Sequence, residues 1–455
     1  MTKSPWTEVK GSVARIVWPP LLQGSNATME ALVRLLGDTQ WLSADELAAN
    51  QFSQLRVVAD HCARYSPHFR RRMTEAGLTA KDFTSHEALR KLPLLSRRDL
   101  QSNAREIYCS EVPQEHLPPH ENRTSGSTGE PVIVKRTRMG QLFWLAITMR
   151  EYFWHEGRFD LRYSAIRPTV PGHRIVENWG APAELLFDTG KAQLIPIVTP
   201  VAQIAQWLTQ FDPHVLIVYP SVLDALLDHR EKHGLELPSL QIIRTISETL
   251  KPCIRERALA ALPVKFADNY SSQEAGIIAI QCPDSDLYHV MSESLIVEVI
   301  GEDGHACSEG EVGRVVLTDL HNFATSLIRY DIGDYAEVGG PCPCGRGLPT
   351  LKRVLGRERN LILMPDGSRH WPLVGFAHFR EAAPVVQYQF IQHTREEIEM
   401  RLVVETPLTS QQETNLTKIV QEALGFPFAL RFTYFPDQIQ RAANGKFEEF
   451  ICAAS

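Results

Sequence analysis

The chain has 455 residues, of which 44% are hydrophobic and 22% charged, and its formal net charge is −7 at pH 7. This length allows about three domains with buried cores, and the acidic balance argues against a nucleic-acid-binding protein, which is usually basic. No apolar run approaches the roughly 20 residues that cross a bilayer, and residues 1–6 lack the apolar core of a signal peptide. Eight cysteines are too few to indicate a disulfide framework. We therefore expect a cytoplasmic protein that binds neither nucleic acid nor membrane.

Residues 1–120 form a charged region in which helices are predicted. Ser43, followed three residues later by Glu46, is a capping box that opens a helix. Residue types alone indicate no chemistry in this region.

A loop rich in glycine and hydroxyl groups follows, with the sequence Thr124-Ser125-Gly126-Ser127-Thr128-Gly129-Glu130-Pro131. Glycines let such a loop fold tightly and bring backbone N–H groups close to an anion, and the hydroxyls add further donors. It is not a Walker A motif, because no Lys-Ser/Thr pair follows Gly129 and residues 132–134 predict a strand. Residues 124–129 are therefore candidate phosphate ligands, and an ordinary polar hairpin turn is the alternative.

The next part of the chain predicts a layered α/β structure. Residues 140–155 form an apolar helix whose aromatic stripe is more typical of a core than of a ligand wall. Predicted strands and helices then alternate, with strands at 163–166, 185–187, 194–198, 215–219 and 242–246 and helices at 201–211 and 220–227. This βαβ order places ligands at the carboxyl ends of the strands.

The chain resembles the adenylate-forming enzymes, the superfamily of acyl-CoA synthetases, peptide-synthetase adenylation domains and luciferases. The loop at 124–131 is similar to the phosphate loop of that superfamily, and residues 65–70 and 92–100 resemble the opening helices of its phenylacetate–CoA ligase branch. The resemblance implies an α/β fold with a large layered N-terminal domain, residues 1–356, which includes a small β-subdomain within residues 294–334. It also implies a small, mobile α+β C-terminal domain, residues 357–455.

The resemblance also implies a site for the adenine of ATP at two predicted strand ends. Ser247 and Glu248 follow one strand, and Asn269 and Tyr270 follow a short strand near 264–266. In the resembling family both places hold the adenine.

Three further residues match nucleotide or metal positions of the family. Glu274 matches the glutamate that ligates Mg²⁺, although the usual Tyr-Gly-x-Thr/Ser-Glu has become Tyr-Ser-Ser-Gln-Glu. Such a carboxylate bridges Mg²⁺ to ATP phosphates and offsets their charge; an acidic first helical turn is the alternative interpretation. Asp334 ends a Tyr-x-x-Gly-Asp motif and is expected to accept hydrogen bonds from the ribose. Arg357, in the Gly-Arg pair that begins the hinge between the domains, is expected near the ribose or a phosphate.

Two turn-borne groups of cysteine and histidine flank the expected β-subdomain. Cys282 and His289 precede it, and Cys342 and Cys344 follow it, so together they would make a tetrahedral Cys₃His zinc site. Members of the resembling branch can carry a structural zinc between these segments. Four protein ligands leave no open position, so the metal would be structural. The alternatives are two free cysteines with an unrelated histidine, or Cys307 in place of His289.

The C-terminal part of the chain predicts strands at 385–391, 397–404 and 431–435 and a helix at 410–424. Lys446, in Ala443-Asn444-Gly445-Lys446-Phe447, matches the terminal Gly-Lys motif of the family, whose lysine enters the active site for adenylation. A lysine there neutralises charge on the attacking carboxylate and the α-phosphate. With Glu274, it completes the expected catalytic pair; a lysine after an ordinary Asn-Gly turn is the alternative.

The hinge departs from the family pattern. The usual Gly-Arg-x-Asp-Asp is here Gly356-Arg357-Glu358-Arg359-Asn360, so both acidic residues are lost. The glycine-rich motif on the CoA side is replaced by a Pro-Asp-Gly hairpin at 365–367. Adenylation is therefore better supported than transfer to CoA.

These features predict a ligase that activates a carboxylic acid with ATP and Mg²⁺ and passes the acyl group to CoA. An amine, a hydroxyl or a carrier-protein thiol as acceptor is one alternative, and a non-catalytic zinc-stabilised binding module is another. An aromatic acid is expected, because Trp144, Tyr152, Trp154 and Trp179 occur in the segment that lines the acyl pocket in the resembling family. His173 and Arg174 are expected either at a ring substituent or in a solvated loop. A homodimer is left open.

Overall fold

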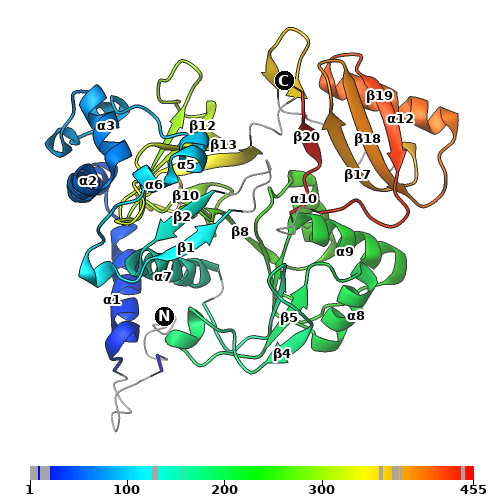
Figure 1. The fold of residues 1–455 in the computed structure, drawn as a ribbon. Coiled ribbons are helices and arrows are strands. Elements are labelled where there is room, and N and C mark those ends of the chain that lie inside the picture. Colours follow the sequence, from blue (N-terminus) through cyan, green and yellow to red (C-terminus); the bar gives the residue numbers. More distant parts are fainter. Residues whose placement is uncertain are drawn as a thin grey trace. The chain divides into compact units, whose positions relative to one another are not determined.

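The computed structural model describes residues 9–10, 21–124, 132–155, 157–357, 362–370, 379, 382–441 and 446–454. The chain divides into two compact units, Met1–Leu355 and Gly356–Ser455, each with its own sheet and hydrophobic core (Figure 1). The predicted α/β fold, with a large N-terminal part and a small C-terminal part, is confirmed. No helix in the described ranges is long and apolar enough to cross a membrane.

The first unit begins with a helical layer, as predicted. Its helices are α1 (Gly24–Thr39), α2 (Ala44–Tyr65), α3 (Pro67–Glu75), α4 (His86–Arg90), α5 (Arg97–Ser102) and α6 (Ala104–Ile107), with 3₁₀ turns at Ala80–Asp82 and Gln114–His116. The capping box at the start of α2 is present, because Ser43 Oγ accepts from the Glu46 N–H and the Glu46 carboxylate accepts from the Ser43 N–H. The apolar sides of α2 and α3 pack on the β-subdomain through Phe52, Leu55, Phe69, Ile296, Leu320 and Ile328.

A large mixed sheet forms the body of the first unit, together with a separate hairpin of β1 (His120–Arg123) and β2 (Ile133–Arg136). Within the described residues the order of the large sheet is β11-β12-β13-β14-β10-β9-β8-β7-β6-β3-β5-β4. Its strands are β3 (Tyr163–Arg167), β4 (Arg174–Val176), β5 (Ala192–Pro196), β6 (Val215–Val218), β7 (Ile242–Thr245), β8 (Lys265–Ser272), β9 (Gly276–Gln281), β10 (Tyr288–Val290), β11 (Leu295–Ile300), β12 (Val312–Asp319), β13 (Tyr330–Val338) and β14 (Thr350–Arg357).

The strand β8 changes partner type along its length. Its first residues, 265–268, pair in parallel with β7, and its last residues, 269–272, pair antiparallel with β9. The strands β3, β5, β6 and β7 are likewise parallel to their neighbours, apart from the antiparallel edge strand β4. The parallel half of the sheet and the antiparallel β-subdomain are therefore joined through one strand.

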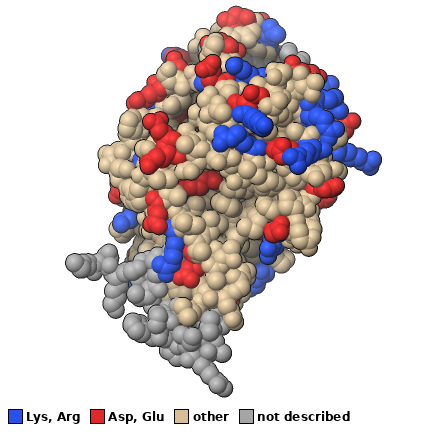
Figure 2. Space-filling model, turned by 90° about the vertical axis from the view of Figure 1, so that its left-hand side faces the viewer, with Lys and Arg blue, Asp and Glu red and all other residues tan. Residues whose placement is uncertain are grey.

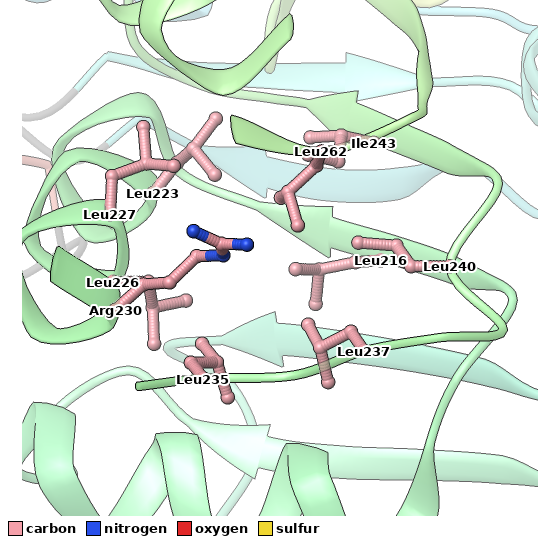
Figure 3. Close-up of a pocket in the computed structure, with 10 residues that line it drawn as sticks. All are labelled: Leu216, Leu223, Leu226, Leu227, Arg230, Leu235, Leu237, Leu240, Ile243 and Leu262. Carbon is pink, nitrogen blue, oxygen red and sulfur yellow. The ribbon is translucent and has the colours of Figure 1, made fainter. Parts of the chain in front are cut away.

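Helices cover both faces of the parallel half, which explains why its strands are continuous apolar runs. The helices α8 (Val201–Phe211), α9 (Pro220–His233) and α10 (Pro252–Ala261) pack on one face, and α7 (Arg138–His155) lies on the other (Figure 1). Two consecutive residues of β7 show the alternation: Ile243 points into the leucine-lined space under α9, whereas Arg244 contacts Glu151 and Tyr152 of α7. Figure 3 shows that space, where the Arg230 side chain reaches in among leucines.

Two sequence expectations differ from the structure. The predicted strand 185–187 is instead a 3₁₀ turn at Ala183–Leu185 followed by a connection, in which Phe187 packs on Phe159 and Phe153 and forms an isolated β-bridge with Val9. The short strand near 264–266 is longer than predicted, so Asp268, Asn269 and Tyr270 lie inside β8 rather than after it.

The second unit is an α/β layer of its own. Its strands are β15 (Ile362–Leu363), β16 (Arg369–His370), β17 (Val385–Gln392), β18 (Glu397–Val404), β19 (Ala429–Tyr434) and β20 (Phe450–Cys452), and α12 spans Ser410–Leu424. The sheet order β19-β18-β17-β20 combines an antiparallel central pair with parallel outer strands. The apolar face of α12, with Leu416 and Val420, packs on Phe390, Met400 and Leu402 of the sheet.

Charges of both signs share the surface around α2 and α3. Figure 2 shows Lys and Arg side chains lying among Asp and Glu side chains on this face. Ion pairs such as Arg64 with Asp60 and Arg71 with Glu106 neutralise neighbouring charges there. Basic and acidic side chains therefore lie close together on this face.

Candidate active site and metal centre

Glu274 lies within a buried group of charged side chains in the first unit. Its side chain is 2% exposed, and Oε1 accepts hydrogen bonds from Arg97 Nη1 at 3.2 Å and from the Tyr330 hydroxyl at 3.5 Å. Arg136 is also buried near this carboxylate, and it donates to the Gln273 carbonyl at 2.8 Å. Burial lowers the pKa of Arg136 to about 10, so it remains a cation at neutral pH. The carboxylate is thus paired with Arg97, and a second buried arginine lies nearby.

Arg97 reaches Glu274 because the segment before α5 is hydrogen-bonded to the start of β13. The Leu95 N–H donates to the Arg329 carbonyl at 2.7 Å, and the Asp331 N–H donates to the Leu95 carbonyl at 2.9 Å. This bridge places Leu95 beside Tyr330, so Arg97 and Tyr330 approach the same carboxylate from neighbouring backbone segments.

Local structure on both sides of the bridge fixes its position. Ser96 and Asp99 form a reciprocal capping box that begins α5 at Arg97. On the other side, Arg329 has a φ of +51°, which is uncommon for a residue with a side chain. Its guanidinium forms a buried ion pair with Glu298 at 3.1 Å and donates to backbone carbonyls between α4 and α5. Such strain persists where surrounding contacts over-determine the conformation.

Thr124 ties the predicted phosphate loop to this group. Thr124 is buried, its N–H donates to the Val132 carbonyl at 2.8 Å, and its Oγ1 accepts from the Val132 N–H at 2.8 Å and from Arg97 Nη2 at 3.1 Å. The two ends of the loop are therefore pinned together beside Arg97. The candidate ligands Ser125, Gly126, Ser127, Thr128 and Gly129 lie outside the described residues.

The structure brings together Tyr270 and Asp334, which are separated by the whole β-subdomain in sequence. The Tyr270 hydroxyl donates to Asp334 Oδ2 at 2.7 Å, and both residues are buried. In the same strand, Asp268 accepts from Thr245 Oγ1 and the Tyr288 hydroxyl at 2.6 Å each, and burial raises its pKa to about 6. These residues form a buried polar group where the parallel and antiparallel strands meet.

Ser247 and Glu248 lie at the carboxyl end of β7, as predicted. Ser247 has a φ of +68°, so the chain turns sharply there. Glu248 Oε2 accepts from the Ser221 N–H at 2.9 Å in the first turn of α9, where a carboxylate also interacts favourably with the helix dipole. Glu248 thus has a structural contact, and its role toward a nucleotide stays a prediction.

Asn269 belongs to a buried polar group under α7. Its Nδ2 donates to Glu151 Oε1 at 3.0 Å, and Arg244 pairs with the same carboxylate at 3.5 Å while its guanidinium lies 4.3 Å from the Tyr152 ring centre. Glu151 and Arg244 are each 2% exposed in their side chains. This ion pair is held between the helix and the sheet, and Asn269 connects it to the strand that carries Tyr270.

The four aromatic residues expected in one acyl pocket lie in different surroundings. Trp144 lies under the Arg136 guanidinium at 4.2 Å and against Gly276. Trp179 stacks on Tyr163 and lies edge-on to Tyr152 in the core. Trp154 lies edge-on to His289. The contact of Trp144 with Arg136 connects this aromatic residue to the Glu274 group.

The residues expected at a ring substituent also have other contacts. His173 stacks on Trp207 with ring centres 4.0 Å apart and contacts Gln193 at 3.2 Å, whereas Arg174 is exposed on the edge strand β4. Both positions fit the alternative of a loop and edge strand at the surface.

The predicted zinc ligands form one cluster. The ligand atoms of Cys282, His289, Cys342 and Cys344 all lie within 4.8 Å of one another. The Sγ atoms of Cys342 and Cys282 are 3.6 Å apart, and Cys344 Sγ is 3.3 Å from His289 Nε2. A tetrahedral zinc ion with ordinary bond lengths gives separations of about 3.8 Å and about 3.5 Å for these pairs. The donor set and its spacing therefore fit zinc.

Neighbouring groups orient these ligands. His289 Nδ1 contacts the Leu348 carbonyl at 3.3 Å, which leaves Nε2 facing the cysteines, an arrangement typical of metal-bound histidine. The Ser285 hydroxyl lies 3.2 Å from Cys342 Sγ, and the Asp284 N–H donates to Cys282 Sγ at 3.5 Å. Cys307 is absent from the cluster, since its Sγ lies in the β11–β12 hairpin beside Gly313.

Lys446 and Arg357 belong to the second unit. Lys446 is half-buried and precedes the segment that joins β20 to β17, where the Phe390 N–H donates to the Glu449 carbonyl. Arg357 ends β14 at the boundary between the two units. Their catalytic and nucleotide-binding roles remain predictions.

Arg97, Arg136 and Tyr330 were missed as candidate residues from sequence. In the sequence, Tyr330 is recognisable only as the first residue of the motif that ends at Asp334. Arg97 lies within residues 1–120, where residue types alone indicate no catalytic or binding site. The available signal was a pair of adjacent arginines at a helix start, Ser96-Arg97-Arg98-Asp99, which is also what a solvated helix would show.

The chain is similar to several known proteins. Residues 373–452 match the CapK C-terminal domain family. The chain is 24% identical to the phenylacetate–coenzyme A ligase of Thermus thermophilus over 386 residues, which cover 81% of this chain and 84% of that protein. It is 23% identical to protein CapK of Staphylococcus aureus over 52% of this chain and 53% of that protein.

The fold is similar to that of a solved 2-hydroxyisobutyryl-CoA ligase. The structure of that ligase in its postadenylation state with an acyl-AMP has a TM-score of 0.71, 22% identity and 90% coverage of each chain. Its structure with an acyl-AMP and CoA has a TM-score of 0.60, 22% identity and 91% coverage of each chain.

Proposed function

We propose that this chain, a member of the adenylate-forming ligase superfamily and a homologue of phenylacetate–CoA ligases and CapK, joins a carboxylic acid to AMP and passes the acyl group to CoA. The observation that carries the first step is the buried Glu274 carboxylate held by Arg97 beside the closed ends of the segment 124–132. An anion site and a metal-binding carboxylate are thereby joined through one arginine.

In the first step, a substrate carboxylate oxygen attacks the α-phosphorus of ATP, and the bond to pyrophosphate breaks. Negative charge moves onto the phosphate oxygens, so preorganised cations and N–H donors are the main requirement. Arg97 and Thr124 are placed to bind phosphate oxygens, and Arg136 adds a second buried cation. We assign Lys446 as the cation that offsets charge on the attacking carboxylate and the α-phosphate.

The residues around Glu274 fit a magnesium–nucleotide complex. Mg²⁺ held by Glu274 would offset the charge of the phosphate oxygens. Arg97 now neutralises that carboxylate at 3.2 Å and also contacts Thr124 at 3.1 Å. When Mg²⁺ takes the place of Arg97 at Glu274, the other side of the Arg97 guanidinium, beside Thr124, can still contact a phosphate.

The nucleoside is proposed to lie along the strand junction. Tyr270 and Asp334 share a 2.7 Å hydrogen bond at the position where the family pattern places ribose and base. Ser247, Glu248 and Asn269 border the same strand ends. A ribose diol would donate hydrogen bonds to the Asp334 carboxylate.

The Cys₃His cluster is assigned a structural zinc. A closed tetrahedral site contributes its binding free energy to folding. Here it would link the β9–β10 turn to the segment between β13 and β14, and both flank the β-subdomain. With four protein ligands, the zinc has no open coordination position at which a substrate could bind.

The acid is proposed to be aromatic, supported by Trp144 beside Gly276 and close to the Glu274 group. The acceptor is proposed to be CoA; the altered hinge at 356–360 and the CapK-type C-terminal match keep an amine, hydroxyl or carrier thiol as the second candidate.

The test is acid-dependent ATP–pyrophosphate exchange, followed by mass spectrometry of products from pooled aryl and alkyl acids with and without CoA. Acyl-adenylate that becomes acyl-CoA supports both steps. Acyl-adenylate without acyl-CoA rejects the CoA step, and a preference for long alkyl acids rejects the aromatic pocket. Absence of exchange across a broad panel, with ATP binding intact, indicates a non-catalytic binding module.

A further inference from the structure

A pair of cysteines with a histidine lies outside both sites described above. Cys62, on α2, is fully buried, and Cys109, which follows α6, is partly exposed. Their Sγ atoms are 3.9 Å apart, and the neighbouring His61 ring helps to lower the pKa of Cys109. A second sulfur within van der Waals contact and an imidazole at the same thiol are the elements of a reactive cysteine site.

The surrounding charges distinguish the two sulfurs. Contact with Cys62 and the hydrogen bond with His61 lower the pKa of Cys109 to about 6, against the opposing effect of burial. The same contact and full burial raise the pKa of Cys62 well above its ordinary value, with Asp319 and Arg72 acting in opposite directions on it. His61 is held in place because its Nε2 contacts the carbonyls of Phe323 and Glu111 at 3.1 Å each.

We propose that Cys109 and Cys62 form a thiol site that reacts with hydroperoxides, with Cys109 as the attacking sulfur and Cys62 as the resolving sulfur. In the first step, the Cys109 thiolate attacks the terminal peroxide oxygen. An S–O bond forms, the O–O bond breaks, and the alkoxide or hydroxide leaving group takes a proton from solvent. Cys109 becomes a sulfenic acid and has lost two electrons to the peroxide.

In the second step, Cys62 attacks the sulfenic sulfur. The S–S bond forms, and the Cys109 hydroxyl leaves with the Cys62 proton as water. The two sulfurs must approach from 3.9 Å to about 2.05 Å. Only partial exposure of Cys109 is needed, because the small peroxide reaches it from the surface while Cys62 reacts from the interior.

The backbone around Cys109 is well tied to the protein, so the site is preorganised. The Cys109 N–H donates to the Ala324 carbonyl at 3.0 Å, the Ser110 N–H donates to the Tyr65 carbonyl at 2.9 Å, and Tyr108 bridges to Thr325. Oxidation would therefore cross-link α2 to the segment that precedes the β1–β2 hairpin without rearranging the fold.

The test treats the full-length reduced protein with a few equivalents of hydrogen peroxide at pH 7, blocks remaining thiols and maps the peptides. We expect a Cys62–Cys109 disulfide that a reductant reverses. In Cys62→Ser and Cys62→Ala, Cys109 should stop at a sulfenic acid that dimedone traps. Cys253→Ser, which changes an exposed cysteine on α10, should behave as the wild type. Oxidation of Cys253 with Cys109 left reduced would overturn the proposal, as would absence of a dimedone adduct in both folded Cys62 variants.

A second measurement addresses the role of His61. The iodoacetamide rate at Cys109 should reach half its plateau near pH 6, well below the pH at which an ordinary thiol titrates. His61→Asn should move this midpoint upward while the circular dichroism spectrum stays unchanged. A rate that rises through pH 8 in the wild type, as for an unperturbed thiol, would contradict the assignment of Cys109 as the attacking sulfur.

Discussion

Replacing Arg97 with alanine tests the link between the metal-binding carboxylate and the phosphate loop. The change removes the 3.2 Å contact with Glu274 and the 3.1 Å contact with Thr124. Removing one partner of a buried ion pair costs about 3–5 kcal/mol. Because Arg97 is 17% exposed and Arg136 still lies near the carboxylate, we expect a cost somewhat below this range, about 2–3 kcal/mol in the free energy of unfolding without ligand.

The stability assay is urea unfolding of the wild type, Arg97→Ala, Glu274→Gln and the double variant, arranged as a double-mutant cycle. Contacting charges should give a coupling energy of about 1–3 kcal/mol. Arg314→Ala is the matched control, since Arg314 pairs with Asp331 at 3.0 Å on the same sheet but with 31% exposure. Its loss should cost less than about 1 kcal/mol. Additive costs for Arg97 and Glu274, within about 0.5 kcal/mol, would refute a direct interaction.

The catalytic assay uses the same Arg97 variants in ATP–pyrophosphate exchange. Loss of one preorganised donor to developing phosphate charge should lower the exchange rate on the order of 10²–10³-fold in Arg97→Ala. Arg97→Lys keeps the charge but loses the planar fork that spans two acceptors, so its loss should be smaller. Exchange at the wild-type rate in Arg97→Ala, with Arg314→Ala also unchanged, would reject a role for Arg97 in adenylation.

Three further predictions concern other parts of the molecule. Lys446→Ala should abolish exchange while ATP binding, measured by calorimetry, stays within a few-fold of the wild type; near-normal exchange would reject its role. Metal analysis should find one zinc per chain, and Cys342→Ser with Cys344→Ser should remove it and lower the unfolding temperature; sub-stoichiometric zinc in the wild type would contradict the four-ligand site. Burial raises the pKa of Asp268 from 3.8 to about 6, so the unfolded state loses its proton first as pH rises. The free energy of unfolding should therefore fall between about pH 4 and 6, by up to about 3 kcal/mol from this group, and Asp268→Asn should flatten that fall in pH-dependent urea titrations.

Short sequence patterns correctly predicted those helices and strands whose formation depends on residues close together in the chain. The capping box at Ser43, the helix 410–424 and the apolar strand 215–218 all follow from periodicity or short-range hydrogen bonds. The zinc ligands could be proposed because few residue types bind zinc, and two cysteine-containing segments flank the β-subdomain. The strand predicted at 185–187 was wrong, since Leu185 belongs to a 3₁₀ turn and Phe187 packs on Phe159 with a single bridge to Val9.

Arg97 could not be found from sequence because its partner lies 177 positions away. The pairing depends on a backbone bridge between Leu95 and Tyr330, which no local pattern encodes.

The expected aromatic pocket shows a second limit of prediction from sequence. Trp144 and Trp154 lie on one helix, but the helical rise separates them by about 15 Å. One contacts Arg136 and the other His289, so neighbours in sequence serve different parts of the molecule.

The change of pairing within β8 has a consequence for how the first unit opens. Residues 265–268 hydrogen-bond to the parallel strands, and residues 269–272 to the antiparallel ones, while separate apolar clusters lie on either side. Each half can therefore exchange its amide hydrogens through its own partial unfolding, with β8 as the shared boundary. A molecule held along this strand would stabilise both halves together. Amide protection that differs between the halves in the free protein should become uniform when the nucleotide is bound.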